Sequence, residues 1–136
     1  MQTKGGNFMA KMADLQIGKY DLTLKISRTI LMDAFSSNPE MAEKIVNGSN
    51  ITITQAYDFC KIALLSMCKA HESSFDQNKI QEIFDYTEDC IIEEDGVEMV
   101  ATDYLVKKVM ELVSLGFTKS DNAEKIEITL SQKNPN

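Results

Sequence analysis

The chain has 136 residues, which is enough for one domain with a single modest core and too few for two independent cores. Apolar residues make up 43% of the sequence and charged residues 26%, so the composition argues against a wholly disordered chain. The formal net charge of −7 repels phosphate backbones. We therefore do not expect direct binding to nucleic acid.

Cysteine usage and hydropathy point to a cytoplasmic protein that does not associate with membranes. The three cysteines, Cys60, Cys68 and Cys90, are odd in number and show no C-x-x-C spacing. This pattern argues against a zinc knuckle, a redox motif or a disulfide framework, and we interpret all three as reduced core residues. No apolar run is long enough for a signal peptide or a membrane span.

Residues 1–12 are polar and contain glycine, and we expect a disordered leader there. The stretch "ADLQIGKYDLTLKI" then alternates apolar and polar residues on both sides of Gly18, which predicts a β-hairpin with a tight turn. In the following "SRTILMDAFSS" and "SNPEMAEKIVNG", the apolar spacing changes to that of a helix. These two segments predict two short helices, the second ending at Asn47 and Gly48.

Thr52 and Gln55 form a capping box that leads into "AYDFCKIALLSMCKA", a segment apolar on nearly all sides. We therefore expect a helix at the centre of the fold. A second capping box, at Ser74 and Gln77, predicts another helix whose apolar stripe reaches Ile91 before Gly96 interrupts it.

A last helix is predicted from Glu98 to Leu115, closed by Gly116. Asp103, Lys107 and Glu111 lie four residues apart on it, as in a ladder of ion pairs. Residues 118–136 are expected to be a mobile tail or an edge strand. The predicted fold is mainly α, of the α+β class: a single domain over residues 13–117 with an N-terminal hairpin, four to five helices and a possible C-terminal strand.

The stretch "DYTEDCIIEEDG", residues 85–96, carries six carboxylates in twelve positions. A helix–loop–helix calcium site is excluded, because it needs glycine at position six and glutamate at position twelve, where this chain has Cys90 and Gly96. Glu82, Asp85, Glu88 and Asp89 are interpreted as the solvated edge of an amphipathic helix. Glu93, Glu94 and Asp95 are expected at the C-terminal end of that helix, where the helix dipole disfavours carboxylates, unless the helix stops a turn earlier. A recognition surface for a basic partner, or a weak divalent-cation site at Glu93, Glu94 and Asp95, are the alternatives.

No catalytic cluster is recognised. The only histidine, His71, has no cysteine or serine in a plausible triad and is interpreted as a surface residue, so neither an enzyme nor a cofactor or metal is expected. The carboxylates and an apolar stripe on the last helix are instead the candidate protein-interaction residues: Asp85, Glu88, Asp89, Glu93, Glu94, Asp95, Met99, Val106, Met110 and Val113.

The order of elements resembles that of the tail assembly chaperones of long-tailed bacteriophages, found in siphophages and prophages. The resemblance lies in "LQIGKYDLTLKISRTILMDAF", a hairpin leading straight into a helix, and in "SNITITQAYDFCKIALLSM", a threonine-capped apolar helix followed by two further helices. Many members of that family end at a programmed ribosomal frameshift. Gln132, Lys133 and Asn134 are compatible with a slippery run of A bases.

The resemblance implies a non-catalytic protein of the host cytoplasm that binds the tape measure protein and tail tube subunits during tail morphogenesis. Homo-oligomers remain possible. A second hypothesis is an acidic inhibitor or decoy, whose carboxylates imitate nucleic-acid phosphates and occupy a basic cleft of a partner. A third is a small enzyme whose site is not recognisable in the sequence.

Overall fold

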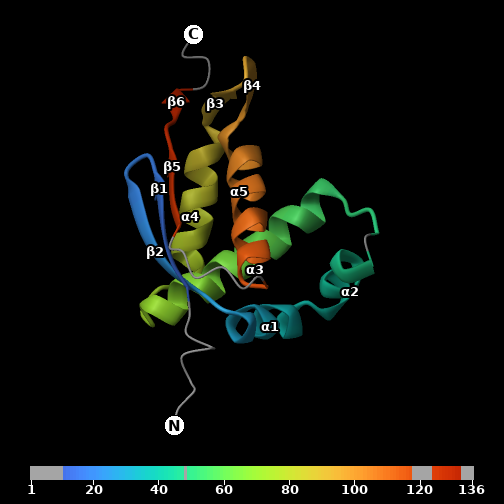
Figure 1. The fold of residues 1–136 in the computed structure, drawn as a ribbon. Helices are drawn as coiled ribbons and strands as arrows, with labels where there is room; N and C mark the ends of the chain where they lie inside the picture. Colours follow the sequence, from blue (N-terminus) through green and yellow to red (C-terminus); the bar gives the residue numbers. More distant parts are fainter. Residues whose placement is uncertain (1–10, 48, 118–123, 133–136) are drawn as a thin grey trace.

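The computed structural model describes residues 11–47, 49–117 and 124–132. Helices occupy most of these residues, and the strands form two separate small sheets (Figure 1). The strands are β1 (Lys11–Ile17), β2 (Tyr20–Ile26), β3 (Cys90–Glu94), β4 (Val97–Val100), β5 (Glu124–Ile128) and β6 (Ser131–Gln132). The helices are α1 (Arg28–Ser37), α2 (Pro39–Asn47), α3 (Ile53–His71), α4 (Gln77–Glu88) and α5 (Ala101–Leu115).

The first sheet has the strand order β2-β1-β5. The predicted hairpin is confirmed as the antiparallel pair of β1 and β2, and Gly18 adopts a φ of +55° in its turn. Every second residue is buried, as in Leu15 and Leu24, because one face of the sheet packs on the core. The C-terminal segment is a strand, β5, which pairs parallel to β1 at the edge of this sheet.

The two short helices and the central helix lie where the sequence predicts them. The capping box of α3 is present in full, since the Thr52 side chain accepts from the Gln55 backbone and the Gln55 side chain accepts from the Thr52 backbone. The middle of α3 is buried against the first sheet and the other helices, with Phe59, Leu64 and Met67 fully inaccessible to solvent. This helix is the centre of the core, as predicted.

The helix that follows differs from the prediction at both ends. Its N-cap is Asp76, whose carboxylate accepts from the Lys79 backbone, so the capping box expected at Ser74 and Gln77 does not form. The helix ends at Glu88, and Ile91 lies in strand β3 instead of in a helical stripe. Aspartate is as good an N-cap as serine, and Asp76 directly precedes Gln77, the first residue of the helix.

Residues 90–100 form a second hairpin, β3 and β4, where the sequence analysis expected a helix end and a helix start. Asp95 and Gly96 make its turn with φ angles of 54° and 81°, as a two-residue turn of type I′ requires. The last helix therefore begins at Ala101, not at Glu98. Strand β6 joins the other side of β3, giving the order β4-β3-β6.

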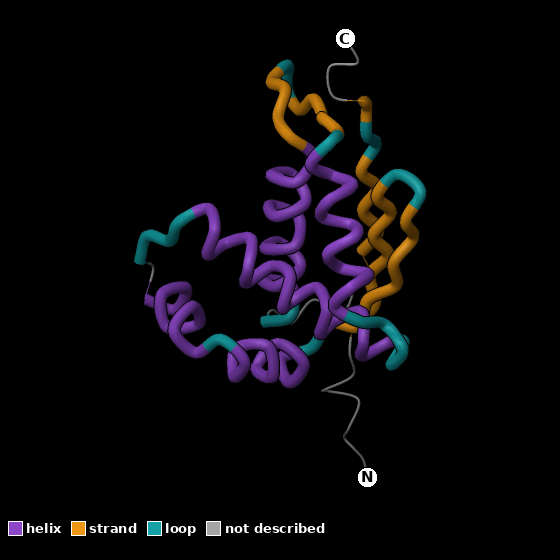
Figure 2. Tube along the Cα trace, turned by 180° about the vertical axis from the view of Figure 1, so that it is seen from behind, coloured by secondary structure: helices purple, strands orange, loops and turns teal. Residues whose placement is uncertain are grey.

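Helices α4 and α5 run side by side, and the second hairpin continues from their upper ends (Figures 1 and 2). Helix α3 crosses their lower ends, with α1 and α2 beneath it. Two buried threonines join α4 to α5: Thr87 donates to the Phe84 carbonyl oxygen at 2.9 Å, and the hydroxyls of Thr87 and Thr102 are 2.8 Å apart. This contact fixes the base of the second hairpin.

The predicted fold class, mainly α with an N-terminal hairpin, is confirmed. Strand β1 begins at Lys11, inside the range expected to be a leader, while residues 1–10 lie outside the described part of the chain. Of the expected tail, residues 124–132 are described, and strand β5 takes the edge position offered as one alternative.

Candidate protein-binding surfaces

A groove of about 740 Å³ lies between α1, α3 and α4. Ile30 of α1, Ile62 and Leu65 of α3 and Ile80 of α4 supply its apolar floor. Ile80 is fully part of the core, whereas Ile62 remains partly accessible to solvent. Helices α1 and α4 each pack against α3 but not closely against each other, and the apolar side chains between them remain partly accessible.

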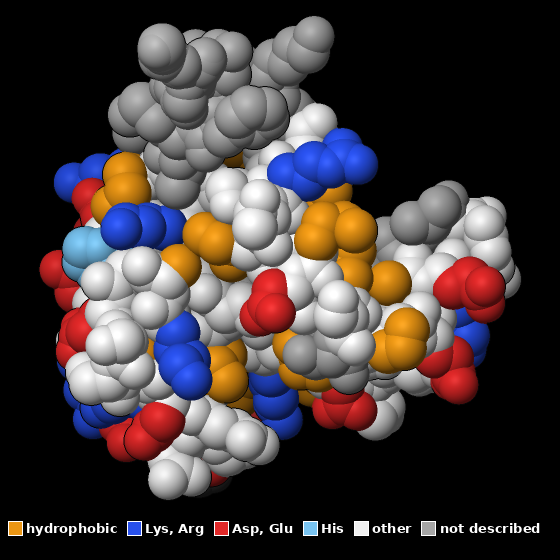
Figure 3. Space-filling model, turned by 90° about the horizontal axis from the view of Figure 1, so that it is seen from below, with side chains coloured by type: hydrophobic (Ala, Val, Ile, Leu, Met, Phe, Trp, Pro, Cys, Tyr) orange, Lys and Arg blue, Asp and Glu red, His pale blue; other side chains and the backbone are white. Residues whose placement is uncertain are grey.

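The rim of this groove is polar and carries charges of both signs. Lys61 and Lys69 lie two turns apart on α3, and Asp33 lies on α1. The Lys61 ammonium donates to the Gln81 side-chain oxygen at 3.2 Å and lies over the Phe84 ring. Figure 3 shows the molecule from below, the side on which α1 and α3 lie, where apolar side chains surface as separate patches between charged ones.

The six acidic residues predicted to take part in binding do not form one helical edge. Asp85 and Glu88 lie on α4, and Asp89 is the C-cap of that helix. The other three belong to the second hairpin, with Glu93 and Glu94 in strand β3 and Asp95 in the turn. The carboxylates thus extend along α4 and onto the hairpin instead of encircling a single site.

Several of these carboxylates, and others near them, have intramolecular partners. Asp85 accepts a hydrogen bond from the Gln81 amide at 2.9 Å. Glu82 accepts one from the Tyr20 hydroxyl at 2.7 Å, and this bond is the main reason why the pKa of Tyr20 is raised to about 12. These contacts hold α4 to its own turn and to the first hairpin.

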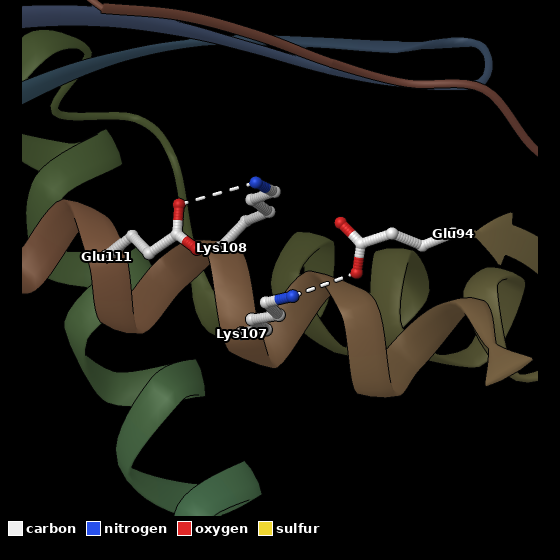
Figure 4. A network of polar contacts seen from close by, with 4 residues as sticks. All are labelled: Glu94, Lys107, Lys108 and Glu111. Atoms are coloured by element: carbon white, nitrogen blue, oxygen red, sulfur yellow. Dashed lines mark hydrogen bonds and ion pairs between the residues drawn. The ribbon is translucent and has the colours of Figure 1, made fainter. Parts of the chain in front are cut away.

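Glu94 links the second hairpin to α5. Its carboxylate lies 2.8 Å from the Lys107 ammonium, while Lys108 pairs with Glu111 at 3.3 Å (Figure 4). The hydrogen bond from Lys107 lowers the pKa of Glu94, and the same bond raises the pKa of Lys107. The predicted ladder of Asp103, Lys107 and Glu111 does not form, because Lys107 reaches across to the hairpin.

The three carboxylates considered as a divalent-cation site lie in the second hairpin. Glu93, Glu94 and Asp95 are not at a helix C-terminus, so the unfavourable helix dipole that motivated the site does not act on them. Glu94 is paired with Lys107. Within residues 11–47, 49–117 and 124–132, no three His, Cys, Asp or Glu side chains are grouped so that they could hold a metal ion.

The apolar candidates on the last helix mostly face inward. Val113 is 5% exposed and belongs to the core, and Val106 and Met110 are partly buried against it. Met99 precedes the helix, in strand β4. Only the accessible parts of Met99, Val106 and Met110 are available to a partner.

The thiols and the histidine do not form a reactive site. Cys60, Cys68 and Cys90 are free and buried, as predicted. Burial raises the pKa of Cys60 and Cys68 to about 12, so both remain protonated at neutral pH. His71 is the exposed last residue of α3. Near the other end of that helix, Tyr57 donates a hydrogen bond to Asp103, and burial followed by this bond raises the Tyr57 pKa.

The sequence analysis missed two features. The Asp95-Gly96 pair between alternating residues is a strong hairpin signal, and it identifies the second hairpin once a helix is no longer assumed there. The groove has no comparable local signal, because its three helices meet only through the packing of distant segments.

Comparison with known proteins gave no match to a family model, to a curated protein or to a solved structure. In the described part of the chain, no helix has the length and apolar character that crossing a membrane requires.

Proposed function

We propose that this protein is a non-catalytic assembly chaperone of the kind that its sequence resembles. In this proposal it holds an amphipathic helix of a tape measure protein until tail tube subunits replace it. The observation that carries the proposal is the groove between α1, α3 and α4, in which Ile30, Ile62 and Leu65 remain partly accessible to solvent.

The groove suits a helix better than an extended segment. Helical partners insert side chains spaced by three, four and seven residues into an apolar groove between helices. Ile62 and Leu65 are one turn apart on α3, and Ile30 faces them from α1 across the groove. An apolar stripe on the bound helix covers these side chains and gains about 25 cal/mol per Å² of apolar surface removed from water.

The charges at the rim indicate which residues flank that stripe. Two cations, Lys61 and Lys69, line α3, and a single carboxylate, Asp33, lies opposite them. The rim is therefore slightly positive, although the whole protein carries −7. We expect the bound helix to place carboxylates next to its apolar stripe on the side that faces α3.

The acidic residues of α4 and the second hairpin have a separate role in this proposal. None of the six acidic candidates lines the groove, and their like charge keeps a complex with an apolar partner in solution. The acidic-decoy hypothesis has less support, because a phosphate mimic needs free carboxylates. Glu82, Asp85 and Glu94 already accept hydrogen bonds or ion pairs within the protein.

Co-expression tests the proposal. The chain is produced together with helical segments of the long coiled-coil-rich protein encoded beside its gene, and the soluble fraction of those segments is measured. We expect the wild type to keep them soluble and Ile62→Glu to leave them insoluble. A neighbourhood without such a gene, or segments that stay insoluble beside the wild type, would contradict the proposal.

Ile53→Glu is the matched control. It places the same substitution on the same helix, but Ile53 is 73% exposed and lies outside the groove. This variant should behave like the wild type. Raising the salt concentration should weaken the complex only slightly, whereas a phosphate mimic loses affinity steeply with salt.

A further inference from the structure

Strand β4 leaves one side of the second sheet without a partner in the described part of the chain. The strand order is β4-β3-β6, and β4 pairs only with β3. An unpaired edge presents backbone N–H and C=O groups that can bond to an added strand. Val97 of this strand is 59% exposed.

The two faces of this sheet differ in character. Glu93 and Glu98 are directly opposite each other in the register of β3 and β4, so they share one face. A concavity of about 400 Å³ is lined by both residues, by Ile91 and Ile92, and by Glu127, Thr129 and Ser131. The register places Ile92, Val97 and Met99 on the opposite face, together with Glu94, whose carboxylate is paired with Lys107.

We propose that the outer edge of β4 binds an extended segment of another protein in which basic and apolar residues alternate. Side chains of an added strand point alternately to the two faces. Its lysines or arginines then reach Glu98 and Glu93, and its apolar residues cover Val97 and Met99. The two like charges of Glu93 and Glu98 repel each other across the strands in the free protein, and a cation placed beside them relieves this repulsion.

Charge excludes a second copy of this chain as the occupant. Antiparallel pairing of two β4 strands brings the Glu93–Glu98 rows of both copies onto the same face of the joined sheet, where four carboxylates repel one another. The acidic row thus protects the edge from self-association and selects for a basic strand. This surface is separate from the groove between α1, α3 and α4.

A short acetylated peptide of alternating lysine and valine is the probe. We expect it to shift the backbone amide resonances of β3 and β4 and to slow hydrogen exchange in β4. Glu98→Lys should weaken binding at least about fivefold, because it turns an attractive cross-strand pair into a repulsive one. Glu88→Lys is the control: it makes the same change at an exposed position on α4 and should lower the affinity by less than about twofold.

Three results would overturn this proposal. The first is resonance shifts centred on α4, which indicate general attraction to acidic residues. The second is equal loss of affinity in the Glu98 and Glu88 variants. The third is equal binding of a peptide that alternates glutamate and valine. Ile62→Glu should leave peptide binding unchanged, so failure of the chaperone proposal and failure of this one are distinguishable.

Discussion

The hydroxyl pair of Thr87 and Thr102 permits a quantitative test of how α4 is joined to α5. Both side chains are fully buried. The single hydroxyl hydrogen of Thr87 is donated to the Phe84 carbonyl oxygen, so Thr102 must be the donor in the contact between the two threonines. Replacing either residue by valine keeps the shape of the side chain and removes its hydroxyl.

The two single substitutions should differ in cost. Thr87→Val leaves the Thr102 hydroxyl buried without an acceptor and removes the bond to Phe84, and we expect a loss of about 2 kcal/mol in the free energy of unfolding. Thr102→Val leaves Thr87 bonded to Phe84, and we expect a loss of about 1 kcal/mol. The double variant has no orphaned hydroxyl and should lose only about 1 to 2 kcal/mol, less than the two single losses together.

Urea unfolding followed by circular dichroism measures the three differences. A domain of this size has a slope of about 1 to 3 kcal/mol per molar urea, so the Thr87→Val midpoint should fall by about 1 M. Additive losses, or a double variant less stable than Thr87→Val, would show that Thr102 does not depend on Thr87 for its hydrogen bond. The assigned direction of donation would then be wrong.

Three further predictions concern turns, charge and thiols. Gly18→Ala should lower the thermal unfolding midpoint more than Gly96→Ala. Both glycines have a positive φ, so alanine is strained at either position. In addition, a Cβ at Gly18 would lie 2.6 Å from the Tyr86 hydroxyl, whereas a Cβ at Gly96 would meet no other atom within 4 Å. The hydrogen bond from Lys107 lowers the pKa of Glu94 in the folded protein. The ion pair should therefore stabilise the fold at any pH above the pKa of this carboxyl group in the unfolded chain. The stabilisation should disappear as the pH falls through the lowered pKa of the folded state. Lys107→Gln should therefore reduce the urea midpoint at pH 7 and leave it nearly unchanged at pH 2, and an equal reduction at both values would contradict the ion pair. The three cysteines should react with a thiol reagent much more slowly in the native protein than in urea, since all are buried, and rapid labelling of the native chain would show that the core opens.

The sequence predicts those elements whose signals are local. Gly18 between two alternating runs specifies the first hairpin, and the Thr52–Gln55 capping box specifies the start of α3. Both depend on residues that are close in sequence, so the tertiary structure does not override them. The central position of α3 likewise follows from its composition, because a helix that is apolar on most sides must be covered by other elements.

The prediction for residues 90–100 was wrong because the apolar spacing of α4 continues into the strand that follows it. Ile91 follows Thr87 by four residues and so continues the helical stripe of α4, yet it lies in strand β3. Pairing with β4 across the Asp95-Gly96 turn makes it a strand, and β6, about forty residues later in the chain, adds a second partner that no local pattern reveals. The groove escapes sequence analysis for the same reason, since Ile62 becomes its floor only when α1 and α4 pack on either side of α3.

The positions of β5 and β6 have a consequence for synthesis. Strand β5 adds the third strand to the sheet that the first hairpin begins, and β6 adds the third strand to the sheet at β3, so residues 124–132 supply one strand to each sheet. While the ribosome is still adding these residues, β1 and β3 each lack a neighbour, and the nascent chain exposes two open edges. Contacts of such high sequence separation also form slowly. Both sheets therefore wait for residues 124–132, which cover the outer sides of β1 and β3 only after those strands have been made.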